Sequence, residues 1–111
     1  MSKMITILRN FPWITAAAGT YVTPWVYYPA ELGDCEMITV VECMDSGSVD
    51  VHLESSTDGV SKLTTGSASG VNTVGPHQDT FAVKGSMVRV ELESAAQTFM
   101  TLSVYLLPKV S

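Results

Sequence analysis

The feature that most constrains the fold of this chain is an alternation of apolar and polar residues with a period of two. In the segment 49–55, one set of alternate residues is apolar and the other is polar: Val49, Val51 and Leu53 against Asp50, His52 and Glu54. Successive side chains of a β-strand point to opposite faces, so the segment predicts a strand with one buried and one solvated face. Since no amphipathic helix pattern interrupts such segments, the chain is expected to be all-β.

The same alternation recurs towards the C-terminus. The segment 87–93 predicts inward Val88, Val90 and Leu92 and outward Arg89, Glu91 and Glu93. In the segment 98–107 one face is apolar and the other is only half polar, which predicts a strand covered on both sides. The apolar face is Met100, Leu102, Val104 and Leu106, and the second face is Phe99, Thr101, Ser103, Tyr105 and Leu107.

Turn-forming residues separate the expected strands. They occur at 45–48, 57–59, 84–86 and 94–97, and they predict hairpins. The glycine- and serine-rich segment 66–78 is expected to be an exposed loop of about 13 residues. Together these signals predict a single antiparallel β-sandwich over residues 1–111, jelly-roll-like, with about seven or eight strands.

The first third of the chain differs from the regular strands expected over 36–107. Residues 1–30 are rich in aromatic residues and proline, and they predict a strand at 4–9 and an edge-like strand at 21–28 broken by Pro24. The aromatic rings either cap one end of the core or form an adhesive surface that binds a partner. The candidate partner-binding residues are Phe11, Trp13, Tyr21, Trp25, Tyr27 and Tyr28.

Composition favours a protein that acts by contact. Only 15% of the 111 residues are charged and 46% are hydrophobic, so some apolar surface is expected to remain for a partner. A net charge of −5 without a basic run argues against nucleic acid. With no signal-like segment and no apolar run of about 20 residues, we expect a protein made in the cytoplasm that does not enter a membrane.

The two cysteines are expected to be free thiols. Cys35 directly precedes one expected strand, 36–43, and Cys43 ends it. Eight residue steps of a strand span about 26 Å, whereas a disulfide needs Cα atoms within about 7 Å. A packing role is expected for Cys43.

No catalytic or metal-binding constellation is evident, so no enzyme, cofactor or metal is expected. The His and Cys residues lack metal-ligand spacing. In the string 66–70 Ala68 stands where a hydrolase nucleophile would be. His77 and Asp79 are interpreted as ordinary loop residues.

Two groups of outward-facing residues leave weaker functional alternatives open, acid/base catalysis and pH sensing. Glu91 and Glu93 are spaced as acid/base carboxylates, but Arg89 on the same face can neutralise them. His52 lies between Asp50 and Glu54, where it is either a pH sensor or a solvated cross-strand partner. The solvated interpretation is preferred for both.

The segment 49–59, a strand that runs into a Ser/Thr-Asp-Gly turn, is similar to hairpins of phage-particle β-sandwiches. In size and organisation the chain resembles the capsid decoration (cement or staple) proteins of tailed phages, jelly-roll type, as on the Salmonella phage epsilon 15. This resemblance implies a homodimer or trimer on the virion surface that staples neighbouring major capsid subunits from outside. The alternative is a carbohydrate- or receptor-binding module in which Trp13, Trp25 and Tyr27 stack on sugars.

Overall fold

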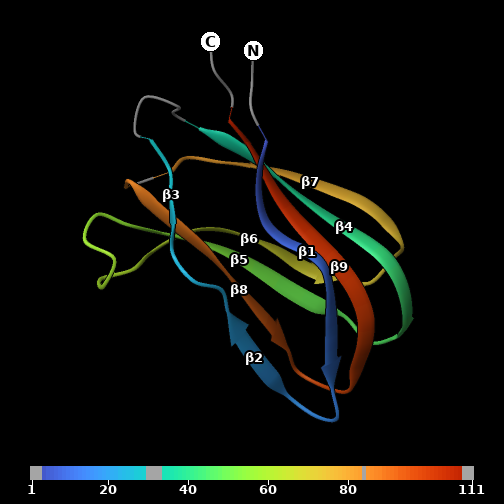
Figure 1. Ribbon diagram of the computed structural model, residues 1–111. Coiled ribbons are helices and arrows are strands. Elements are labelled where there is room, and N and C mark those ends of the chain that lie inside the picture. Colours follow the sequence, from blue (N-terminus) through green and yellow to red (C-terminus); the bar gives the residue numbers. More distant parts are fainter. Residues whose placement is uncertain (1–3, 30–33, 84, 109–111) are drawn as a thin grey trace.

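The computed structural model describes residues 4–29, 34–83 and 85–108 as two antiparallel sheets packed face to face (Figure 1). The strands are β1 (Ile5–Thr15), β2 (Gly19–Val22), β3 (Val26–Tyr27), β4 (Cys35–Ser46), β5 (Val49–Ser56), β6 (Leu63–Val71), β7 (Gly75–Phe81), β8 (Met87–Ser94) and β9 (Thr98–Pro108). In this part of the chain, no helix is long and apolar enough to span a membrane.

The strand order is that of a jelly roll. The first sheet has the order β1-β9-β4-β7, and the second has the order β2-β8-β5-β6, with β3 also pairing with β8. Below they are called the β1 sheet and the β2 sheet. β2 and β3 pair with different parts of β8 and therefore occupy one strand position in the sheet. The nine strands thus fill eight positions, four in each sheet, which is the arrangement of a jelly roll. The predicted antiparallel sandwich is confirmed.

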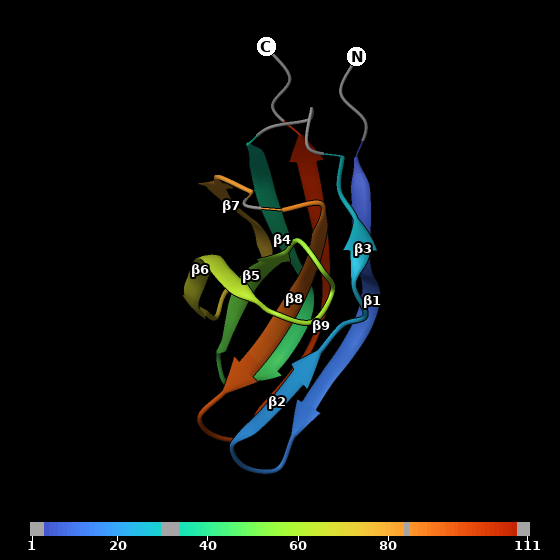
Figure 2. The same ribbon diagram turned by 90° about the vertical axis from the view of Figure 1, so that its left-hand side faces the viewer.

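The core lies between the two sheets, and Figure 2 shows the β2 sheet crossing in front of the β1 sheet. The predicted inward residues of β5, β8 and β9 are at most 1% exposed. The second face of β9 is less uniform than expected, because Ser103 is buried whereas Phe99 is 52% exposed. Each sheet therefore supplies one apolar face, as the alternation predicted.

The first strand is longer than expected because a bulge bends it without ending it. The register of β1 against β9 shifts between Leu8 and Phe11, and Asn10 has a φ of 49° there, a conformation that Asn tolerates better than most residues. The edge strand breaks at Pro24 as predicted. Thr23 spans the break: its backbone N donates to the Val90 carbonyl at 2.9 Å, and its Oγ1 accepts from the Val90 backbone N at 3.0 Å.

The prediction of an exposed loop at 66–78 is wrong. Residues 63–71 form β6 on β5 and residues 75–81 form β7 on β4, with only residues 72–74 between them. Gly66 lies directly beneath the ring of Phe81, where a larger residue would collide with it. Backbone pairing at a sheet edge needs no apolar side chain on the paired strand, so composition alone misidentified this segment.

The turn between β4 and β5 should depend on Gly47. This residue has a φ of +90°, and an added Cβ would lie 2.6 Å from the Gln97 carbonyl oxygen and 2.7 Å from the Thr98 Cα. We expect Gly47→Ala to lower the free energy of unfolding by about 2–4 kcal/mol, through both backbone strain and overpacking. Urea unfolding measures the change.

Gly70→Ala is the matched control, because Gly70 also has a positive φ of +64° but has open space around its Cβ position. It should cost only about 1–2 kcal/mol. Equal losses in the two variants would contradict the close packing of the β4–β5 turn against the start of β9.

Candidate functional site

The six aromatic residues proposed for partner binding do not form one surface. Trp13 and Tyr28 lie in the core, and the Trp13 Nε1 donates to Ser94 Oγ at 2.8 Å. Phe11 and Tyr21 are half-buried and stack on each other with ring centroids 4.8 Å apart. The core-capping interpretation describes this group well.

The other two aromatic residues lie on the outer side of the edge strand. The half-buried Trp25 packs on Arg89, whose Cζ is 4.3 Å from the ring centroid. Tyr27 is 66% exposed, so it is the ring of the six with the most surface to offer a partner. The partner-binding role of the group stays a prediction.

Tyr28 and Cys35 form a buried pair of weak acids. Burial raises the pKa of Tyr28 to about 12, with further contributions from Cys35 and Asp34. Burial also raises the pKa of Cys35 to about 11, and the Asp34 carboxylate adds to this shift. Both groups therefore stay protonated at neutral pH, and they act as packing residues.

The prediction that Cys43 has a packing role is wrong, because Cys35 is the buried cysteine. Both thiols are free, but Cys43 is exposed and Cys35 is buried. The expectation failed because the register of β4 against β9 shifts between Val41 and Cys43, which turns Cys43 outward.

Glu54 was expected to face solvent, yet it is only 1% exposed. Its Oε1 accepts from the Arg89 Nε at 2.7 Å and its Oε2 accepts from the Lys62 Nζ at 3.1 Å. Burial alone raises the pKa of Glu54, but the hydrogen bonds from the two cations outweigh it and hold the pKa below its usual range. Arg89 is therefore committed to Glu54 rather than to Glu91 and Glu93.

The turn after β5 is held by its own carboxylate. Asp58 Oδ1 accepts from the backbone N of Val60 and of Ser61, both at 2.8 Å, and from Ser56 Oγ at 3.0 Å. These bonds lower the pKa of Asp58 to about 2. This turn places Lys62 beside Glu54.

Glu54→Gln should lower the free energy of unfolding by about 3 kcal/mol at pH 7, because it leaves Arg89 without its charge partner. The pKa of Glu54 is lowered in the folded state, so its stabilising effect is present above the unfolded pKa of roughly 4.3 and is lost as pH falls through the folded pKa. Urea unfolding at pH 7 and pH 3 should show the difference between variant and wild type shrinking in acid. A constant difference would contradict the ionised Glu54.

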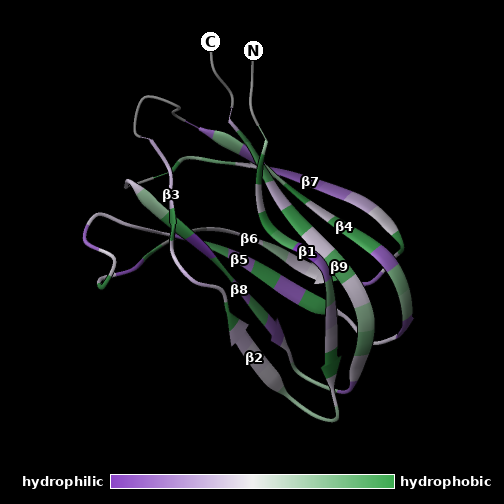
Figure 3. Ribbon diagram, viewed as in Figure 1, coloured by the Kyte–Doolittle hydropathy of each residue, from purple (hydrophilic) through white to green (hydrophobic). Residues whose placement is uncertain are grey.

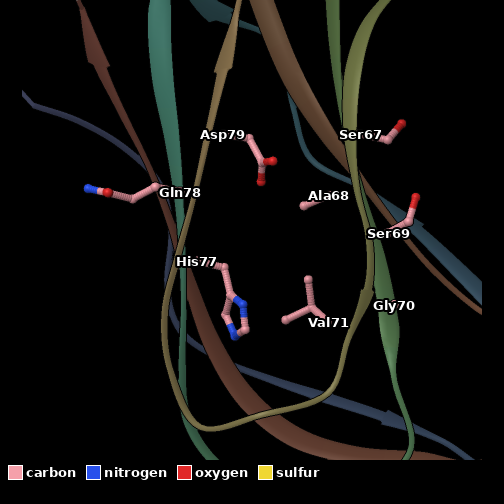
Figure 4. A pocket seen from close by; sticks show the side chains of 8 residues that line it. All are labelled: Ser67, Ala68, Ser69, Gly70, Val71, His77, Gln78 and Asp79. Carbon is pink, nitrogen blue, oxygen red and sulfur yellow. The ribbon is translucent and has the colours of Figure 1, made fainter.

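A cavity of about 360 Å³ separates the free edges of β6 and β7. Figure 4 shows His77 and Asp79 pointing into it from β7, and Ala68 and Val71 pointing into it from β6. Ser67 and Ser69 point away, and the His77 Nε2 donates to the Thr73 carbonyl at 2.9 Å. The arrangement places neither of these serine hydroxyls where His77 could activate it.

At one end of the sandwich, the end of β1 and its loop to β2 are hydrophobic and are green in Figure 3. Ile14 and Phe99 face each other across β1 and β9 and are 57% and 52% exposed. Thr15 Oγ1 donates to the Ala96 carbonyl at 3.2 Å, which joins the two alanine-rich loops. We call the set the loop-end surface: Pro12, Ile14, Ala16, Ala17, Ala18, Cys43, Ala95, Ala96 and Phe99.

None of the nine residues of the loop-end surface is Asp, Glu, Lys or Arg, but the exposed Glu42 and Asp45 lie on either side of Cys43 on β4. Sequence reasoning missed it because its members come from three separate segments, 12–18, 43 and 95–99. The only sequence signals were the low charge content and the alanine runs of the two loops.

No protein-family model matches this chain, and no curated protein matches it. The chain does superpose on a chain in the structure of infectious bursal disease virus Gx strain. The TM-score is 0.57 at 12% sequence identity, over 96% of this chain and 31% of the other. The likeness is one of fold. This chain spans less than a third of the length of the viral chain, and the shared part is the β-sandwich.

The two thiols should differ sharply in reactivity. In the native protein Cys43 should react quickly with a disulfide reagent such as DTNB. Cys35 should react at least about a hundredfold more slowly, because it is buried and its pKa is about 11. Cys43→Ser should remove the fast phase and Cys35→Ser should keep it. Two fast thiols in the folded protein would contradict the placement of Cys35.

Proposed function

We propose that this chain is a structural virion protein that binds the outside of a phage capsid and staples neighbouring major capsid subunits. It acts by contact, without catalysis or a cofactor. The observation that carries the proposal is a jelly roll that resembles part of a virus structure over 96% of its length. The phage assignment and the stapling role rest on the resemblance in size and organisation given above.

The loop-end surface supports a role in contact. It exposes apolar side chains on an otherwise acidic protein, and removing them from water on binding is favourable at roughly 25 cal/mol per Å² of apolar area. The nine side chains themselves carry no Asp, Glu, Lys or Arg charge, so burying them does not desolvate an ion pair. We propose that this surface faces the major capsid protein.

Oligomerisation would strengthen such contacts. A homodimer, or a trimer, would present two or three loop-end surfaces to adjacent capsid subunits at once. Linked contacts raise avidity well beyond the affinity of a single contact. A staple requires this geometry, because it must hold two subunits together.

The carbohydrate-binding alternative has less support. Trp13 is buried, and Trp25 already packs on Arg89. Of the three rings expected to stack on sugars, only Tyr27 is largely exposed. A single exposed tyrosine is a poor platform for a sugar ring.

The test is binding of the purified protein to empty shells assembled from the major capsid protein of the same genome. We expect stoichiometric binding and a higher shell melting temperature. Ile14→Asp and Phe99→Asp should each weaken binding at least about tenfold, because each buries an unpaired charge in the contact. Cosedimentation and calorimetry of the shells measure both effects.

Val60→Asp is the matched control, since Val60 is 83% exposed and lies in the β5–β6 turn, outside the loop-end surface. It introduces the same charge and should bind like wild type. Alkylation of Cys43 should also slow when shells are present. Failure of the wild-type protein to bind shells would exclude the decoration role, and equal losses in all three variants would exclude the loop-end surface.

A further inference from the structure

Three potential metal ligands converge on the outer face of the β2 sheet. Asp50 on β5 lies directly opposite Glu93 on β8, and His52 is the next outward residue of β5. One ligand atom from each residue lies within 4.8 Å of the other two. Metal–ligand bonds of about 2.0–2.2 Å place ligand atoms about 3 Å apart, so modest side-chain rotations would close the site.

The charges of this face are unbalanced. Directly opposed carboxylates repel each other, and Glu91, opposite His52, adds a third carboxylate. Of the three Lys and Arg residues that the structure describes, Arg9 lies in the β1 sheet, and Arg89 and Lys62 both bind Glu54. A cation at the cluster would neutralise Asp50 and Glu93 at once.

Residues outside the cluster hold two of the ligands in place. His52 Nδ1 lies 2.6 Å from Ser67 Oγ on β6, which directs Nε2 towards Glu93 Oε1 at 3.2 Å. Asp50 Oδ1 accepts from the Gly70 backbone N at 2.7 Å. Hydrogen bonds of this kind, on the far side of a ligating His or carboxylate, are a regular part of protein metal sites.

We propose that Asp50, His52 and Glu93 bind a divalent transition-metal ion. One imidazole and two carboxylates favour Zn²⁺ over Mg²⁺ or Ca²⁺, which prefer oxygen ligands alone. The ion would link β5 to β8, and water would complete its coordination. Spacing along the chain offers little sign of the site, because Glu93 lies 41 positions after His52.

Metal binding of this kind has predictable consequences. Zn²⁺ at about ten times its dissociation constant should raise the folding equilibrium constant about elevenfold. Without metal, the contact of His52 Nε2 with Glu93 Oε1 at 3.2 Å is the competing explanation of the cluster.

The experiment uses untagged protein with Cys43→Ser, which removes the exposed thiol as a second zinc ligand. After treatment with EDTA, ZnCl₂ should raise the melting temperature and MgCl₂ at the same concentration should not. His52→Ala and Glu93→Gln should abolish the rise. Ser67→Ala, which removes only a positioning hydrogen bond, should weaken zinc affinity about 10- to 100-fold.

His77→Ala is the matched control, because it removes the other histidine of the chain, and it should respond to zinc like the parent protein. Backbone NMR during a zinc titration of the parent gives a second readout, with shifts expected near residues 50–52, 67–70 and 91–93. No zinc effect on the parent protein, or an undiminished effect in His52→Ala, would overturn the proposal and leave the His52–Glu93 ion pair as the explanation.

Discussion

The pairing of β9 between β1 and β4 is the interaction on which the rest of the structure depends. This last described strand lies beside the first and contributes Met100, Leu102, Val104 and Leu106, all at most 1% exposed, to the core. β9 is the strand that joins β1 to the β4–β7 pair, so the complete β1 sheet cannot form until this C-terminal strand has paired. Such non-local pairing predicts slow folding.

The outer face of the β2 sheet carries the ion pairs found among the described residues. At one end Glu54 is buried and balanced by Arg89 and Lys62, and Trp25 covers Arg89. At the other end Asp50 and Glu93 oppose each other without a Lys or Arg partner among the described residues, and His52 lies beside Glu93. Arg89 and Lys62 bind Glu54 and are therefore not available to Asp50 and Glu93. A bound metal ion would supply the positive charge that these two carboxylates lack.

The surface proposed for binding emerges from the same topology. A jelly roll brings alternate loops to one end of the sandwich, so the alanine-rich loops at 16–18 and 95–97 meet although they are far apart in the sequence. Gly47 allows the β4–β5 turn to pack closely against Gln97 and Thr98 beside them. The result is a cluster of uncharged, mostly apolar side chains on an acidic protein, flanked on β4 by the exposed Glu42 and Asp45.

The sequence by itself determined the all-β class, the inward residues of β5, β8 and β9 and the break at Pro24, because alternation and proline act over a few residues. Only the tertiary structure decided that residues 66–71 pair as a strand, that Glu54 is buried and that Cys43 turns outward. Each of these outcomes depends on a neighbouring strand or a register shift. Local patterns specify which residues avoid water, whereas the partners of edge and polar residues are fixed by contacts between segments that lie far apart in the chain.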